Sequence, residues 1–163
     1  MSDDWIADLV RDFQDTITRG TFAGISQLPE PQRDSVLACQ ARACVDEFVK
    51  LYDLPDNLDF DGFLARMTIG GPSKINVRRD GDTIVWEELH EGQCMCPLVR
   101  REVIPLQAML CGCAVHWLRM LIERFAHRPC RVELLDSVAR GSMNCVFSVT
   151  LGAPPGGRQE SRI

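Results

Sequence analysis

The sequence predicts an α+β domain in which N-terminal helices precede two antiparallel β-hairpins, with a long central helix between the hairpins and packed on their sheet. Apolar residues recur at the three- and four-residue spacing of amphipathic helices over residues 1–70. The spacing changes to alternate residues in two places within 74–151, and a long apolar segment at 105–126 separates them. Elements in this order favour a sheet with helices on one face.

Length and composition indicate one globular domain of ordinary size. With 163 residues, 45% of them hydrophobic, we expect a single domain over 1–151 with a helical part (1–70) and a sheet part (74–151). The net charge of −5 comes without a basic stripe or a phosphate-binding glycine loop, so neither nucleic acid nor a nucleotide is an expected partner. An acidic N-terminus and the lack of a long uninterrupted apolar run predict no membrane span and a cytoplasmic protein.

The first two helices are predicted from their apolar stripes. Residues 3–19 form a helix that we expect to end at Gly20 and to dock on another surface through Trp5, Ile6, Leu9, Val10, Phe13 and Ile17. A second helix follows the loop that ends at Pro31, and it continues to about Tyr52. Its expected buried residues are Leu37, Ala41, Cys44, Val45, Phe48 and Tyr52.

A short third helix and a hairpin come next. The helix starts near Asp59, carries Phe60, Phe63, Leu64 and Met67, and ends at 70–72. Residues 74–79 and 82–89 alternate around Asp80-Gly81, a strong signal for a two-residue hairpin turn. We interpret Glu87, Glu88 and Glu91 as the solvated end of this hairpin.

The central helix and a second hairpin complete the fold. Pro105 suits a first helical position, and the segment from there to Ala126 carries two apolar stripes, which predicts a largely buried helix. His116 lies on its remaining polar face, where we expect solvent. Alternation returns at 130–134 and 145–151 around a turn at Gly141, and we expect the tail 152–163 to be disordered.

Six of the eight cysteines lie within residues 94–145, and they are the strongest functional signal. In a reducing compartment, cysteines indicate metal ligands, reactive thiols or small core residues. Zinc takes four ligands, and two C-x-C pairs supply Cys94, Cys96, Cys111 and Cys113. Two helical residues two positions apart point about 200° apart, so a mixed set with one of the last two and Cys145 is the alternative. Zinc or another thiophilic metal is therefore a candidate cofactor.

Large adaptable side chains near the central helix predict a mostly apolar cavity between this helix and the sheet, with plain core packing as the alternative. The candidate ligand is a small apolar molecule. The candidate ligand-binding residues are Trp86, Met95, Met109, Trp117 and Met120. Open sheet edges and a buried helix in a small domain favour a two-fold homodimer.

The run from Cys94 to Leu151 resembles the 4-vinyl reductase domain family of small-molecule-binding domains. The matching features are a strand rich in valine and glutamate at 132–136, Ser137, the turn at Gly141, and Cys145 followed two residues later by Phe147. The resemblance implies a fold shared with haem-based nitric-oxide sensors and vesicle-tethering subunits. It also implies a pocket for a hydrocarbon-like or tetrapyrrole-like ligand, frequent dimerisation and, in some members, a cysteine-bound metal. The chain departs from the haem-binding branch, because it lacks a C-x-x-C-H attachment and a clearly placed proximal histidine, so no haem is expected.

A cysteine-dependent enzyme or a thiol redox sensor are the alternatives. Cys96-Pro97 after a hairpin is similar to an element of bacterial hydrolases of cyclic thiazoline-type compounds, which would make Cys96 a nucleophile acting on a small heterocyclic substrate. His90 is the nearest histidine in the sequence. A disulfide closed across the two C-x-C pairs would instead make the domain a redox sensor.

Overall fold

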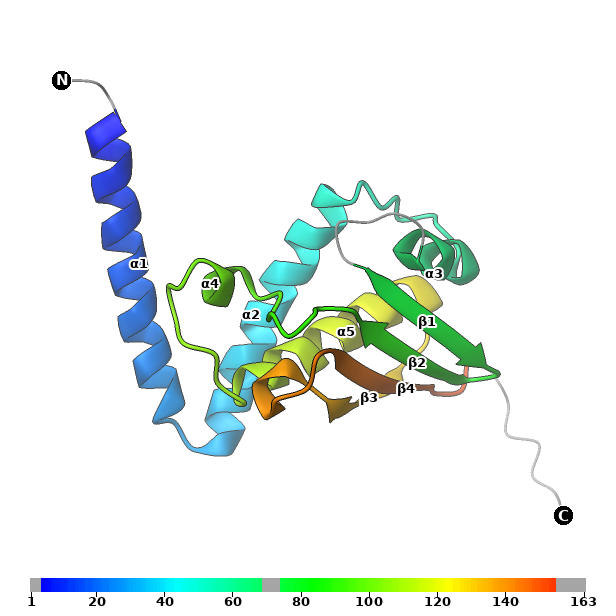
Figure 1. Ribbon diagram of the computed structural model, residues 1–163. Helices are drawn as coiled ribbons and strands as arrows, with labels where there is room; N and C mark the ends of the chain where they lie inside the picture. The colour runs from blue at the N-terminus through cyan, green and yellow to red at the C-terminus, as the bar shows by residue number, and fades with distance from the viewer. Residues whose placement is uncertain (1–3, 69–73, 155–163) are drawn as a thin grey trace, which may run out of the picture.

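The computed structural model describes residues 4–68 and 74–154. It has the predicted α+β class: N-terminal helices precede a four-stranded antiparallel sheet with a central helix packed on it (Figure 1). The elements are α1 (Asp4–Ser26), α2 (Glu30–Leu51), α3 (Phe60–Thr68), β1 (Ile75–Asp80), β2 (Thr83–Glu88), α4 (Pro97–Arg100), α5 (Leu110–Ala126), β3 (Cys130–Asp136), the short 3₁₀ helix η1 (Val138–Arg140) and β4 (Cys145–Leu151). The predicted helix end at 70–72 and most of the predicted tail lie outside the described residues.

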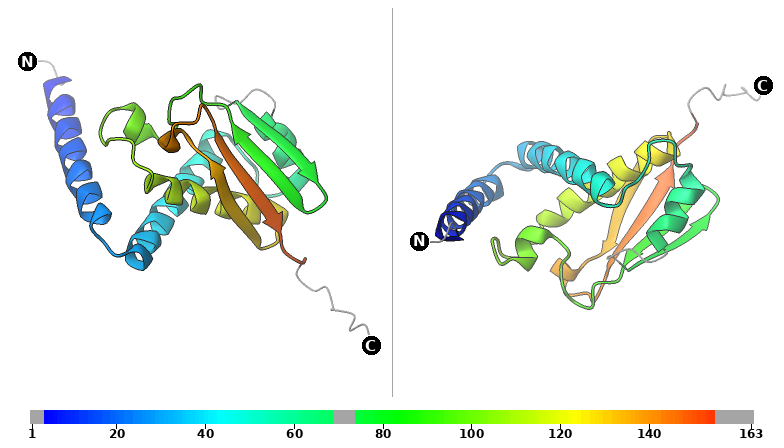
Figure 2. Two further views of the ribbon diagram at one scale, coloured as in Figure 1. Left: turned by 60° about the horizontal axis from the view of Figure 1, so that its bottom comes forward. Right: turned by 90° about the horizontal axis from the view of Figure 1, so that it is seen from above.

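The two hairpins join into one sheet with strand order β1-β2-β4-β3, and every neighbouring pair is antiparallel. Helices α3 and α5 cover one face of this sheet, and α2 packs across α5 on the side away from the strands (Figure 2). β4 therefore lies inside the sheet although it comes last in sequence among these four strands. This arrangement brings the end of β2 next to the beginning of β4.

The first hairpin forms where it was predicted, but its turn lies one residue later than Asp80-Gly81. Asp80 pairs with Thr83, which leaves Gly81 and Asp82 as the two-residue turn. Gly81 has a φ of 57°, a left-handed conformation that glycine adopts without steric cost. The turn thereby sets the register that directs Ile84 and Trp86 to the buried face.

The core is a stack of apolar side chains between the sheet and its two covering helices. Ile84 and Trp86 of β2 are fully buried, as is Phe63 of α3. The rings of Phe63 and Phe125 stack at 4.4 Å, and the rings of Phe63 and Trp86 lie 6.2 Å apart. These side chains pack against one another between the sheet, α3 and the central helix.

Two predicted helix boundaries are wrong. α1 passes Gly20 and ends at Ser26, because an interior glycine costs only about 1 kcal/mol and a longer helix gains hydrogen bonds and buries Ile25. The central helix begins at Leu110 and not at Pro105. The proline that opens a helix is instead Pro97, which begins the unpredicted α4 after Cys96 as its N-cap residue.

The first two helices differ in what their apolar stripes contact. α2 buries Leu37, Ala41, Val45 and Val49, in agreement with its predicted face. Cys44 is the exception: it was expected in this core and is exposed, because the stripe turns toward Val45 and Val49. The stripe of α1 is exposed along its length, and the helix projects away from the rest of the molecule (Figures 1 and 2).

No helix within residues 4–68 and 74–154 has the length and apolar character that crossing a bilayer requires.

Candidate functional site

A polar group closes one end of the buried sheet face. Glu88, the last residue of β2, lies directly opposite Cys145, the first residue of β4. Alternate residues of a strand share a face, so Glu88 continues the row of Ile84 and Trp86 toward the helices. Directly opposed side chains in an antiparallel pair have Cβ atoms about 5 Å apart. The sheet register therefore brings a carboxylate and a thiol together under the helical layer.

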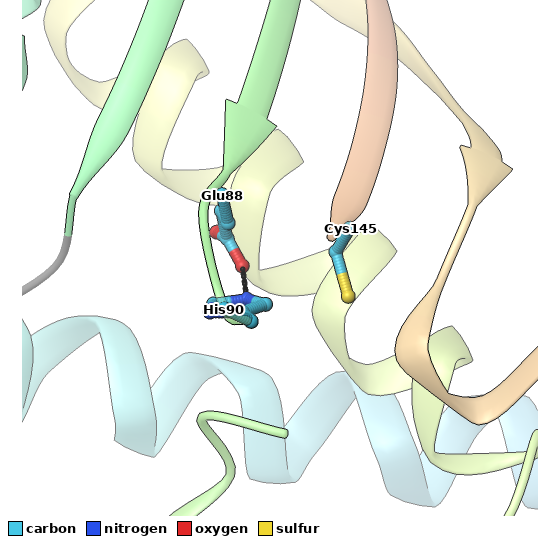
Figure 3. Close-up of side chains that lie close together, drawn as sticks. All are labelled: Glu88, His90 and Cys145. Carbon is cyan, nitrogen blue, oxygen red and sulfur yellow. Dashed lines mark hydrogen bonds and ion pairs between the residues drawn. The ribbon is translucent and has the colours of Figure 1, made fainter. Parts of the chain in front are cut away.

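His90 joins this pair from the loop after β2. Its Nε2 lies 2.9 Å from Glu88 Oε2, and the two side chains are only 4% and 16% exposed (Figure 3). The backbone N–H of His90 donates to Asn144 Oδ1 at 3.1 Å, which ties this loop to the residue before β4. Ligand atoms of Glu88, His90 and Cys145 all lie within 4.8 Å of one another.

A buried tryptophan holds the carboxylate in place. The indole N–H of Trp86 donates to Glu88 Oε1 at 3.2 Å, while Oε2 of the same carboxylate faces His90. Trp86, a predicted ligand-binding residue, is fully buried, lies in the core and positions Glu88. The expectation that Glu88 belongs to a solvated strand end is wrong, because the register turns its side chain inward.

Two further thiols surround Cys145. Burial raises the pKa of Cys145 to about 11, and Glu88, Cys111 and Cys94 add to the rise. Burial also raises the pKa of Cys94, with contributions from Cys96, Cys111 and Glu88, while a hydrogen bond with the Cys96 backbone opposes them. The thiols of Cys94 and Cys111 therefore lie near enough to Cys145 to raise its pKa. Cys94 and Cys145 are protonated at neutral pH unless a cation displaces the proton.

The pair on α5 faces two different groups. Cys111 Sγ lies 3.5 Å from the hydroxyl of the fully buried Ser137 and belongs to the Cys145 group. Burial raises the pKa of Cys113 to about 12, and its neighbouring thiols are Cys44 and Cys96. This separation follows from the angle of about 200° between helical residues two positions apart.

Within 4–68 and 74–154, the set of three metal-ligand side chains that comes within 4.8 Å is Glu88, His90 and Cys145. The predicted metal set of Cys94, Cys96, Cys111, Cys113 and Cys145 contributes one member to it. The sequence signal that was missed is the alternation of Ile84, Trp86, Glu88 and His90, which continues the buried face of β2 into the polar group.

A surface hollow of about 200 Å³ lies beside His90. Its lining residues are Lys74, Leu89, His90, Glu91, Gln93, Met95 and Arg100. Met95 is therefore the one predicted ligand-binding residue that lines it. Trp117 packs edge-on against Phe48 at 5.0 Å, Met120 packs against the core, and Met109 precedes α5 as its N-cap residue.

Comparisons with known proteins show the fold. No protein-family model and no curated protein matches the sequence. Among solved structures, the chain is similar to an H-NOX protein from S. oneidensis in the Fe(II)NO ligation state, with a TM-score of 0.50 and 13% identity over 83% of this chain and 72% of that chain. This likeness agrees with the fold implied by the resemblance to 4-vinyl reductase domains, which extended to haem-based nitric-oxide sensors.

Two further structures are similar at lower scores. One is the phenol-responsive sensory domain of the transcription activator PoxR with phenol (TM-score 0.47, 13% identity, 78% of this chain and 68% of that chain). The other is a trafficking protein particle complex subunit 3 from Naegleria fowleri covalently bound to palmitic acid (TM-score 0.46, 12% identity, 93% and 90%).

Proposed function

We propose that this protein is a small-molecule-binding domain of the 4-vinyl reductase type that holds a thiophilic metal ion, Zn²⁺, at the closed end of its sheet. The proposal rests on one observation: a carboxylate, an imidazole and a thiol converge within 4.8 Å under the helical layer. Burying polar groups costs free energy unless they gain partners, and a metal ion supplies one partner to all of them.

The proposed ligands are a carboxylate oxygen of Glu88, a ring nitrogen of His90 and the thiolate of Cys145, all three of which zinc accepts. Cys94 and Cys111 lie near enough to raise the pKa of Cys145, and either thiol is a candidate for the fourth ligand. The indole N–H of Trp86 donates to Glu88 Oε1, which leaves Oε2 for the metal ion. Hydrogen bonds of this kind orient metal ligands.

The hollow beside His90 is the proposed entry point for the small molecule. At about 200 Å³ it is smaller than the roughly 300–1,000 Å³ of sites for drug-sized ligands, so it fits a molecule of few atoms or one end of a longer one. Leu89 and Met95 supply apolar contacts, in keeping with the expected apolar ligand, and Arg100 and Lys74 lie at the same opening.

Metal analysis of protein purified without chelator tests the metal site. We expect one zinc per chain and, after exchange for Co²⁺, the absorption band of a thiolate-to-cobalt bond. Cys145→Ser should lose both, whereas Cys39→Ser, a change at an exposed cysteine on α2, should keep both. Wild-type protein that takes up no Zn²⁺ or Co²⁺ at micromolar concentration would overturn the proposal.

A redox sensor is the second candidate, because the thiols of Cys94 and Cys111 lie near enough to Cys145 to raise its pKa. In chelator, mild oxidant should then remove two titratable thiols, and dithiothreitol should restore them. The hydrolase alternative has less support. The thiol grouped with His90 is Cys145, whose pKa is raised, whereas an activated nucleophile needs a lowered one.

A further inference from the structure

Helix α1 carries a long apolar stripe that stays about half exposed to solvent along its whole length. The stripe consists of Trp5, Ile6, Leu9, Val10, Phe13 and Ile17, each between 48% and 66% exposed. The opposite face of the helix is the attached one: Asp15 accepts two hydrogen bonds from Arg101 at 3.1 Å, and Ile25 is buried. The helix is therefore anchored with its apolar face turned to solvent (Figure 2).

The second half of the same stripe is built from small residues. Gly20 and Gly24 lie four positions apart and, at 100° per residue, fall on the same side of the helix as Phe13. A Cβ built at either glycine meets no atom within 4 Å. Each interior glycine costs the helix about 1 kcal/mol relative to alanine, and among residues 4–68 and 74–154 no side chain occupies the space beside either glycine.

The size of the stripe fits an interface. If each large side chain offers about 100 Å² of exposed apolar surface, half of what an aromatic residue carries, the six amount to about 600 Å² per copy. That is at the upper end of the largest patches on typical monomers, which run to about 600 Å². It approaches the roughly 800 Å² that each partner contributes to a standard interface.

We propose that α1 pairs antiparallel with α1 of a second copy of this chain. In this arrangement the bulky N-terminal half of each stripe, with Trp5 and Leu9, lies over Gly20 and Gly24 of the other copy. Phe13 lies near the two-fold axis. Large residues then fill the two shallow surfaces that the glycines leave, and both copies make the same contacts.

The charged residues of α1 favour a second copy of the chain over a lipid surface as the partner of the stripe. The polar positions of α1 include Asp8, Asp12 and Asp15 against Arg11 and Arg19, whereas helices that lie on membranes carry basic residues beside the apolar face.

Sedimentation equilibrium of the full chain provides the test. Wild type should be dimeric at micromolar concentration, and Phe13→Asp should be monomeric because it places a charge at the centre of the interface. Gln14→Asp adds the same charge one position away, off the stripe, and should stay dimeric. A monomeric wild type overturns the proposal, as does a Phe13→Asp protein that dimerises like wild type. A monomeric wild type that floats with phosphatidylcholine–phosphatidylglycerol vesicles would assign the stripe to lipid.

A substitution at one of the glycines gives a second test, because it should affect monomer stability and dimer affinity in opposite directions. Gly24→Leu adds a good helix former where the monomer has open space, so helix content and monomer stability should rise or stay unchanged. The dimer should dissociate at least tenfold more readily, because the leucine occupies the seat of Trp5. Dimer affinity that is unchanged or stronger in Gly24→Leu would rule out this packing.

Discussion

The two halves of one face of strand β2 carry opposite chemistry. Ile84 and Trp86 enter an apolar stack with Phe63 and its neighbours, whereas Glu88, on the same face, enters a polar group with His90. The strand pleat and the pairing register are the same in both halves. What differs is the covering layer: aromatic side chains of α3 and α5 lie over the first half, and thiols of the 94–96 loop and the start of α5 lie over the second.

This contrast separates stability from binding. The apolar half gains free energy from burial alone, at about 25 cal/mol per Å². The polar half loses hydration and recovers it through hydrogen bonds such as Trp86 to Glu88. The apolar half should therefore dominate the free energy of unfolding, and the polar half should respond to pH and to metal.

The largest expected effect is at the apolar half. Phe63→Ala removes a fully buried ring that stacks on Phe125 at 4.4 Å, and it should lower the free energy of unfolding by about 3–5 kcal/mol. Urea denaturation of the metal-free protein measures this. Phe60→Ala, at a partly buried ring on the edge of the same cluster, is the matched control and should cost clearly less. Equal effects at the two positions would contradict the assignment of Phe63 to the centre of the core.

An intermediate effect is expected at the polar half. Glu88→Ala leaves the buried indole N–H of Trp86 without its acceptor, which should cost about 1–3 kcal/mol in metal-free protein. Glu91→Ala removes an exposed carboxylate from the same loop and should stay within about 0.5 kcal/mol of wild type. The comparison fails if the two variants unfold at the same urea concentration.

A smaller effect should follow pH. The pKa of Cys145 rises from 9.0 in the unfolded chain to about 11 in the fold, mainly through burial. Its contribution to stability is therefore complete below pH 9 and is lost as pH rises from 9 to 11. Solvent screening of this half-buried thiol limits the loss to about 1 kcal/mol. Metal-free Cys145→Ala should lack this part of the alkaline decline in a melting experiment, and an identical decline would be contrary evidence.

The smallest effect should be at Cys39, which lies exposed on α2 outside both halves. Cys39→Ser should change the melting temperature by no more than about 2 °C and leave metal content unchanged. A larger change would extend the thiol network to α2.

Local signals explain why the fold was accessible from the sequence. Asp80-Gly81 sets the first hairpin whatever the rest of the chain does, and the period change after residue 74 separates helices from strands. The site was only partly accessible. The cysteines were noticed as a density, but the pairing of Glu88 with Cys145 depends on β4 lying beside β2, which no local pattern encodes.

The wrong predictions fall on residues whose type is compatible with two different local structures. Gly20 was interpreted as a helix stop and serves within a helix, and Pro105 fits a loop as well as a first turn. Free cysteine is usually a small buried residue, but Cys44 lies exposed on α2. In each case tertiary contacts overrode a weak local preference.

The central place of β4 has a consequence for synthesis of the chain. Until residue 151 has been made, the first hairpin exposes the edge of β2 that later receives β4, and such an edge is open to pairing with other chains. The partner it waits for is distant in sequence, and distant pairings form slowly. The nascent chain is therefore prone to aggregation until β4 pairs with β2. Pairing along the full length of the two strands places Cys145 opposite Glu88.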